Sequence, residues 1–193
     1  MLAGAGAPPD PPAKNRGEAI NRYRHRLQVS LGRVCNGQWY AGSAPGGPGD
    51  VLVLTTNPWP MRITNQSGVS IYLFAEQRFS VGHVTEGPNA GQWKVKTQAY
   101  VYSLGDTAHP NEAWIHWHWH PPMRDHPHLH IKSDGISATD REGVRGHHVP
   151  TGRVSFEAVL RYLVEDCEVN PREGGRQVLD ENEDLFRRFR TWG

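Results

Sequence analysis

The amino-acid sequence predicts an α+β fold, in which an antiparallel β-sheet of about five to seven strands is followed by two C-terminal helices packed on one face. Two observations predict this class. Segments rich in β-branched and aromatic residues, with apolar and polar positions alternating, fill much of the first two thirds of the chain, whereas after residue 150 the apolar residues recur with a helical period. Strands followed by helices are typical of an α+β architecture.

Length and composition favour one domain. The chain has 193 residues, of which 37% are hydrophobic, and this is enough to bury a single core. We expect residues 1–20, which are rich in Ala, Gly and Pro, to form a disordered tail and residues 21–193 to form the domain. The 21 Lys and Arg nearly balance the 20 Asp and Glu, which excludes the global positive field of a protein that coats nucleic acid.

The cysteines and the apolar runs indicate the cellular compartment of the protein. Cys35 and Cys167 are far apart and form no CxxC pair, so neither a disulfide scaffold nor a thiolate zinc site is indicated. The first residues lack the charged and apolar regions of a signal peptide. No run of about 18 apolar residues is present that would span a membrane. We therefore expect a cytoplasmic protein with no membrane partner.

Four segments before residue 105 are predicted to be strands. Residues 23–31 alternate between an apolar side and an arginine-bearing side, which predicts the first strand. Residues 51–56, 69–84 and 92–104 are rich in β-branched and aromatic residues and predict further strands. Gly- and Pro-rich residues 41–50 predict a loop between the first two.

The end of the chain predicts two helices. One apolar stripe has helical spacing and consists of Phe156, Val159, Leu160, Leu163 and Val164. Ser155 is placed to cap this helix at its N-terminus. A second helix is predicted at about residues 177–190, where acidic residues come first and arginines last, an order that complements the helix dipole.

The histidines of "WIHWHWHPP", residues 114–122, and "HPHLHI", residues 126–131, share one face of each segment. The residues between them, "PPMRD", supply turn chemistry, so the two segments predict a β-hairpin. The register that keeps histidines on one face pairs His116 with His130, His118 with His128 and His120 with His126. Trp117 then lies opposite Leu129, and we expect Trp117 and Trp119 to face the helices in the core.

The histidine face is a candidate metal site. The candidate ligands are His116, His118, His120, His126, His128 and His130. Neutral imidazole is a common metal ligand, and Zn²⁺ accepts three histidines while keeping a fourth position open for water. Asp125 or Glu112 could orient a ligand, and His147 and His148 could close over the same face. Because no HExxH signature is present, the divalent metal is inferred from spacing alone.

Catalysis on the same face is one hypothesis for function. His118, His128 and His130 would serve as general acid and base in cleaving a phosphodiester of RNA or of a nucleotide, with or without the metal. Arg124 or Arg153 would stabilise the developing charge. Arg153 also precedes a predicted helix N-terminus, where anions bind readily, although ordinary capping explains the same pattern.

The alternative is a non-catalytic module. Histidines in strands are often solvated or hydrogen-bonded, so the hairpin could serve only to stiffen the sheet or to bind a protein partner. The sequence leaves this choice open.

The C-terminal half resembles the TumE-like toxins of bacterial toxin-antitoxin modules. The order "YVYSL", a histidine-bearing strand, a Pro-containing loop, "HLHI" and the helix "SFEAVLRYLVE" resembles that family over residues 92–168. The resemblance implies an intracellular toxin that acts on RNA or nucleotides and has an antitoxin-like protein partner. His128 and His130 match the family's histidines, whereas "HWHWH" replaces its Arg-Tyr-Asp element.

Overall fold

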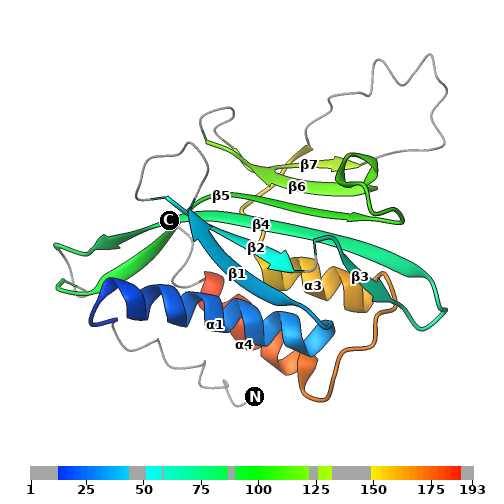
Figure 1. Ribbon diagram of the computed structural model, residues 1–193, viewed down its shortest axis with the longest axis horizontal. Coiled ribbons are helices and arrows are strands. Elements are labelled where there is room, and N and C mark those ends of the chain that lie inside the picture. Colours follow the sequence, from blue (N-terminus) through cyan, green and yellow to red (C-terminus); the bar gives the residue numbers. More distant parts are fainter. Residues whose placement is uncertain are drawn as a thin grey trace, which may run out of the picture.

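The protein forms an antiparallel β-sheet of eight strands with helices on one face, as the sequence predicts (Figure 1). The computed structural model describes residues 13–43, 51–57, 59–86, 90–121, 126–131 and 149–187. These residues form three α-helices, of which two lie at the C-terminal end. The α+β class is therefore confirmed, with one strand more than the largest expected number. None of the helices found in these ranges is long and apolar enough to cross a membrane.

The chain runs through one helix, then the strands, then two helices. The first part consists of α1 (Arg16–Val34), β1 (Gln38–Ser43), β2 (Leu52–Asn57), β3 (Met61–Thr64), β4 (Ser70–His83) and β5 (Trp93–Gly105). The second consists of the 3₁₀ turn η1 (Pro110–Glu112), β6 (Ile115–Trp119), β7 (His128–Ile131), β8 (Val149–Pro150), α3 (Phe156–Glu165) and α4 (Gly175–Leu185). The strand order is β1-β2-β4-β5-β6-β7-β8, and β3 pairs with the first residues of β4.

The first predicted strand is wrong, because residues 23–31 lie inside α1. Tyr23, Leu27 and Leu31 are spaced by four residues and are buried against the sheet, a stripe that fits a helix as well as a strand. The helix is signalled at its start, where the side chain of Asn15 accepts a 2.9 Å hydrogen bond from the backbone N–H of Glu18. Because α1 begins at Arg16, residues 16–20 are helical and do not belong to the tail; residues 1–12 lie outside the described ranges.

The two C-terminal helices are confirmed. The Ser155 hydroxyl accepts a 2.9 Å hydrogen bond from the N–H of Ala158 and caps α3, as expected. The predicted apolar stripe of α3 is buried throughout. The second helix, α4, begins two residues before the expected position, and residues 188–190 of the prediction lie outside the described ranges.

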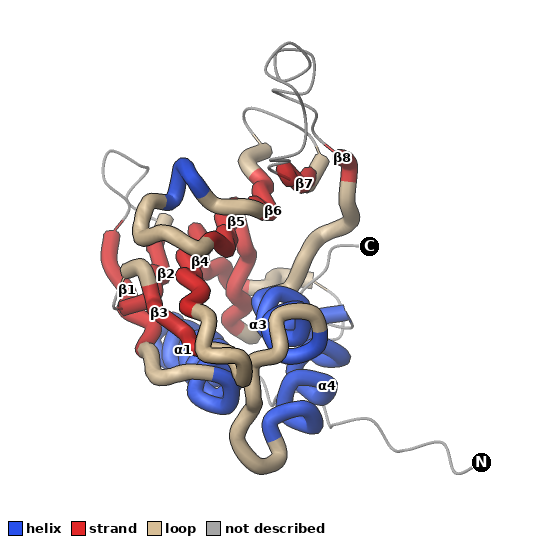
Figure 2. The backbone as a smooth tube through the Cα atoms, turned by 90° about the vertical axis from the view of Figure 1, so that its right-hand side faces the viewer, coloured by secondary structure: helices blue, strands red, loops and turns tan. Residues whose placement is uncertain are grey.

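Strand alternation places the aromatic residues of β5 and β6 beneath the helices. Tyr102 pairs with Trp117 across the two strands, and its ring packs against Phe156 at 5.7 Å between centroids. Trp117 contacts Tyr162 of α3, and both Trp117 and Trp119 are buried with 8% exposure, which confirms their core role. Figure 2 shows the three α-helices gathered on one side of the sheet. The histidines of β6, which have the opposite parity, therefore lie on the face opposite the three α-helices.

The helix-facing core predicts how stability responds to mutation. Leu160 of α3 is fully buried, whereas Val69 is 51% exposed. We expect Leu160→Ala to lower the free energy of unfolding by about 2–5 kcal/mol, because it leaves a cavity under the sheet. The matched Val69→Ala change should cost less than about 0.5 kcal/mol. Urea unfolding followed by circular dichroism measures the free energy of unfolding of both variants. Equal losses in the two variants would contradict the burial of Leu160 in the core.

Candidate metal centre

The predicted histidine hairpin and its register are present. His116 pairs with His130, His118 with His128, and Trp117 with Leu129. The third predicted pair lies beyond the ladder, because β6 ends at Trp119 and β7 begins at His128. The register thus places four histidines in the paired ladder, with His120 and His126 following and preceding it.

Three of the histidines converge. His118, His128 and His130 each offer one ring nitrogen, and these nitrogens lie within 4.8 Å of one another. Ring centroids are 5.7 Å apart for His118 and His128 and 5.0 Å apart for the other two pairs. The cluster combines a directly opposed pair with the residue two positions along β7, the neighbours that an antiparallel ladder brings closest on one face. These three side chains could hold a metal ion.

The imidazole of His118 has the properties of a neutral metal ligand rather than of a charged group. Burial, together with the neighbouring imidazoles, lowers its pKa to about 3, so its ring is neutral at pH 7. Its Nε2 atom is buried and has no hydrogen-bond partner among the described residues. Buried polar atoms normally have a partner. A neutral imidazole with an unmatched nitrogen inside a group of imidazoles fits a metal ligand.

A hydrogen bond fixes the tautomer of His128, whose side chain is buried. Its Nδ1 lies 3.3 Å from the backbone carbonyl oxygen of His126. Since a carbonyl only accepts, Nδ1 carries the proton and, in the neutral ring, Nε2 carries the lone pair. Bonds of this kind orient metal-binding histidines in many proteins. The sequence predicted His128 as a ligand but did not indicate this support.

The other three predicted ligands lie outside the cluster. The ring of His116 is held at Nδ1 by the Ser103 hydroxyl, 2.8 Å away, and burial lowers its pKa. Burial and the positive charge of Arg78 lower the pKa of His120. His126 is exposed, and its ring centroid lies 6.3 Å from that of His128. Of the six predicted ligands, three therefore remain candidates for binding a metal ion, and the other three lie beside them.

The predicted role of Arg153 at this site is wrong. Its guanidinium carbon lies 3.7 Å from the ring centroid of Trp119, on the helix-facing side of the sheet, so the sheet separates it from the histidines. Glu112 is exposed in η1 and accepts a 3.0 Å hydrogen bond from Thr107. Arg124, Asp125, His147 and His148, which the sequence also suggested, lie outside the described residues.

Strand β4 adds two charged residues that the sequence analysis missed. The ladder places Glu76 opposite Val101, which in turn lies opposite His118. Arg78 lies opposite Ala99, and its Nε is 2.9 Å from the Glu76 carboxylate. Both are therefore on the histidine face. Polar residues occur on both faces of β4, so the sequence alone does not show which of them share the face of a later strand.

The described residues thus define a three-histidine cluster on the face of the sheet opposite the α-helices, able to hold a metal ion. Comparison with protein-family models, with curated proteins and with solved structures found no match for this chain. What the cluster does is therefore inferred from its ligand chemistry and from the strand register.

The low pKa of His118 predicts a loss of stability in acid. Between the ordinary histidine pKa of about 6.5 and the folded value of about 3, the unfolded chain binds a proton at this position that the folded chain does not. The metal-free protein should therefore lose stability as the pH falls from about 7 to 4. His118→Gln should flatten that dependence, whereas the matched change at exposed His25 should not. Urea unfolding in the presence of a chelator measures the slope, and equal slopes in all three proteins would contradict the assignment.

Proposed function

We propose that this protein is a zinc-dependent hydrolase of phosphodiesters, with His118, His128 and His130 as the protein ligands. The observation that carries the proposal is the approach of their three ring nitrogens to within 4.8 Å of one another. Nitrogens bound to a tetrahedral zinc ion lie roughly 3.3 Å apart, as follows from Zn–N distances of about 2.0 Å. Binding would therefore require the three imidazoles to draw closer together.

The donor set favours zinc over harder cations. The cluster consists of imidazoles alone, whereas Mg²⁺ and Ca²⁺ require carboxylate, carbonyl and water oxygens. Three histidines leave one position for water, as in catalytic zinc sites. A zinc ion in such a site supplies a nucleophile by lowering the pKa of its bound water to about 7.

The residues around the cluster have roles in this proposal. In place of Arg153, Arg78 would supply the positive charge. Arg78 lies on the histidine face, and its charge lowers the pKa of His120. It would attract the phosphate of RNA or of a nucleotide, the substrates implied by the resemblance to TumE-like toxins. His120, which is neutral at pH 7 because its pKa is lowered, would accept a proton. Ser103 positions His116 beside the ligands.

A second candidate function is a non-catalytic, partner-binding module. Ile131 is 60% exposed and Val149 49% exposed on the neighbouring strands β7 and β8. Apolar side chains exposed together at a sheet edge favour contact with another protein. An antitoxin-like partner, implied by the same resemblance, would fit this edge. A cytoplasmic location is part of either proposal and agrees with the absence of a disulfide between Cys35 and Cys167.

Metal binding is the first test. Protein purified without a His-tag should bind about one equivalent of Zn²⁺, and Co²⁺ in its place should give the visible absorption of a tetrahedral site. His128→Ala should weaken binding by at least about 10- to 100-fold, because the loss of even a supporting residue has an effect of that size. His25→Ala, a change at an exposed histidine of α1, is the control. Less than about a tenth of an equivalent after reconstitution would refute the centre.

Hydrolysis is the second test. The zinc-loaded protein should cleave bis(4-nitrophenyl) phosphate and single-stranded RNA, and a chelator should abolish both activities. His118→Ala should reduce kcat/KM by at least about 100-fold, since it removes a ligand of the metal that supplies the nucleophile. Arg78→Gln should chiefly raise KM, because it removes attraction for the phosphate. A protein that binds zinc tightly but cleaves neither substrate would favour the non-catalytic module.

A further inference from the structure

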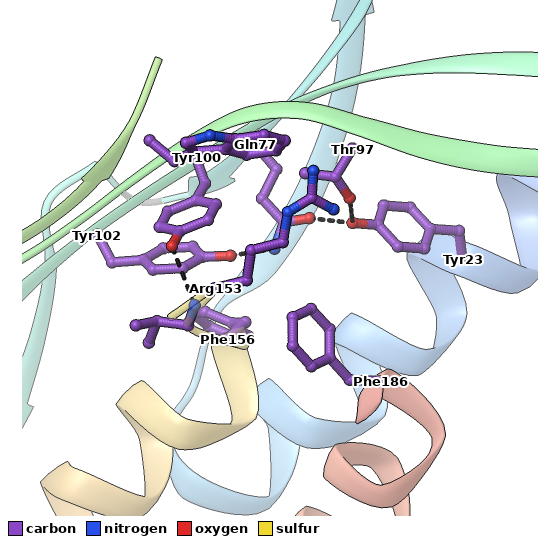
Figure 3. A pocket seen from close by; sticks show the side chains of 10 residues that line it. Tyr23, Gln77, Thr97, Tyr100, Tyr102, Arg153, Phe156 and Phe186 are labelled. Atoms are coloured by element: carbon purple, nitrogen blue, oxygen red, sulfur yellow. Dashed lines mark hydrogen bonds between the residues drawn. The ribbon is translucent and has the colours of Figure 1, made fainter. Parts of the chain in front are cut away.

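A second polar site lies on the helix-facing side of the sheet. Figure 3 shows a cavity bounded by β4, β5 and β6 of the sheet, by α1, by the start of α3 with the residues that lead into it, and by Phe186 at the end of α4. Its volume is about 10 Å³, which accommodates one water-sized atom. Among the described residues that line it, Arg153 alone carries a charge. The sheet separates this cavity from the histidine cluster.

Arg153 lines the cavity, and no acidic side chain among the described residues pairs with it. Its guanidinium stacks on Trp119 at 3.7 Å, an arrangement that leaves the N–H groups around the edge of the plane directed outward. The Nη1 atom is buried and has no hydrogen-bond partner among the residues that the structure describes. Burial lowers the pKa of Arg153, but a guanidinium keeps its charge in a protein. The cavity thus contains a buried N–H group of a cationic side chain, for which the described residues supply no acceptor.

The neighbouring hydroxyls add a donor. The Tyr100 oxygen accepts a 2.9 Å hydrogen bond from the backbone N–H of Val154, which leaves its own proton to donate. Tyr23 donates to the Gln77 side-chain carbonyl and lies 3.3 Å from the Thr97 hydroxyl, so that Thr97 is the donor of that second bond. The Gln77 amide donates to Tyr102. Both the carbonyl oxygen and the amide of the Gln77 side chain therefore have hydrogen-bond partners.

We propose that the cavity is an anion site, in which Arg153 and Tyr100 donate hydrogen bonds to a halide ion or to one oxygen of a carboxylate or phosphate. Among the described residues that line the cavity, the charged Arg153 has a buried Nη1 without a partner, and Tyr100 offers a second donor. A water molecule there would have to place two protons of its own, whereas an anion has none to place. The volume admits a single atom, so a larger anion would keep its other atoms outside. The site requires neither the metal nor the histidines.

The test is direct titration of the whole protein with anions in a buffer free of chloride. Isothermal calorimetry with sodium bromide, acetate and phosphate should show saturable binding of at least one of them to one site. Arg153→Gln should weaken that binding at least about tenfold, the effect of a charge-assisted hydrogen bond of ordinary strength. Arg24→Gln, which removes the same charge from an exposed position of α1, should leave it unchanged.

Tyr100→Phe gives a second variant that keeps the guanidinium. It should weaken binding several-fold, and circular dichroism establishes that each variant is folded. Bromide alone would identify a site for a free inorganic ion, whereas stronger binding of acetate or phosphate would identify a site for the anionic group of a larger molecule. Absence of saturable binding up to about 100 mM, too weak for a built site on the affinity scale, would overturn the proposal. Equal binding by wild type and Arg153→Gln would also overturn it, since the cavity would then hold water only.

Discussion

The alternation of side chains along β6 is the constraint on which both sites depend. β6 is paired on both sides, with β5 through Tyr102 and Trp117 and with β7 through His118 and His128. A slip of one residue in either ladder would turn the indoles outward and the imidazoles beneath the helices. The core would then lose two large aromatic side chains and receive polar rings in their place, which is unfavourable on both counts. Core packing by the tryptophans therefore fixes the histidine face.

The same strand carries two opposite electrostatic environments. On the face opposite the α-helices, His118 is neutral because burial and neighbouring imidazoles oppose its protonation. On the helix-facing side, the next residue, Trp119, holds the charged guanidinium of Arg153 against its ring. A cation would therefore be attracted to unprotonated nitrogens on one face and an anion to donors on the other. Because the backbone of the sheet lies between them, each site is built from its own set of side chains.

The hairpin was predictable from the sequence because its pattern admits few registers. Alternating His and Trp positions specify both the faces and the cross-strand partners, and Ser155 with its apolar stripe specifies α3. The first helix was missed because Tyr23, Leu27 and Leu31 satisfy periods of both two and four, and the cap at Asn15 was the deciding signal. The face of the sheet on which Glu76 and Arg78 lie follows from long-range strand pairing, and that of Arg153 follows from the path of the chain into α3. Local sequence encodes neither of these.

The lowered pKa of His118 affects how strongly protons compete with a metal ion at the proposed site. Metal ions and protons compete for the same imidazole nitrogens, so metal affinity falls when the ligands become protonated. Because its pKa is about 3, His118 does not take up a proton in the mildly acidic range, so protons do not compete with a metal ion for its nitrogen there. The burial that lowers this pKa comes from the same ladder that places the partner imidazoles beside it. One packing arrangement thus keeps a ligand deprotonated and sets it next to the other two.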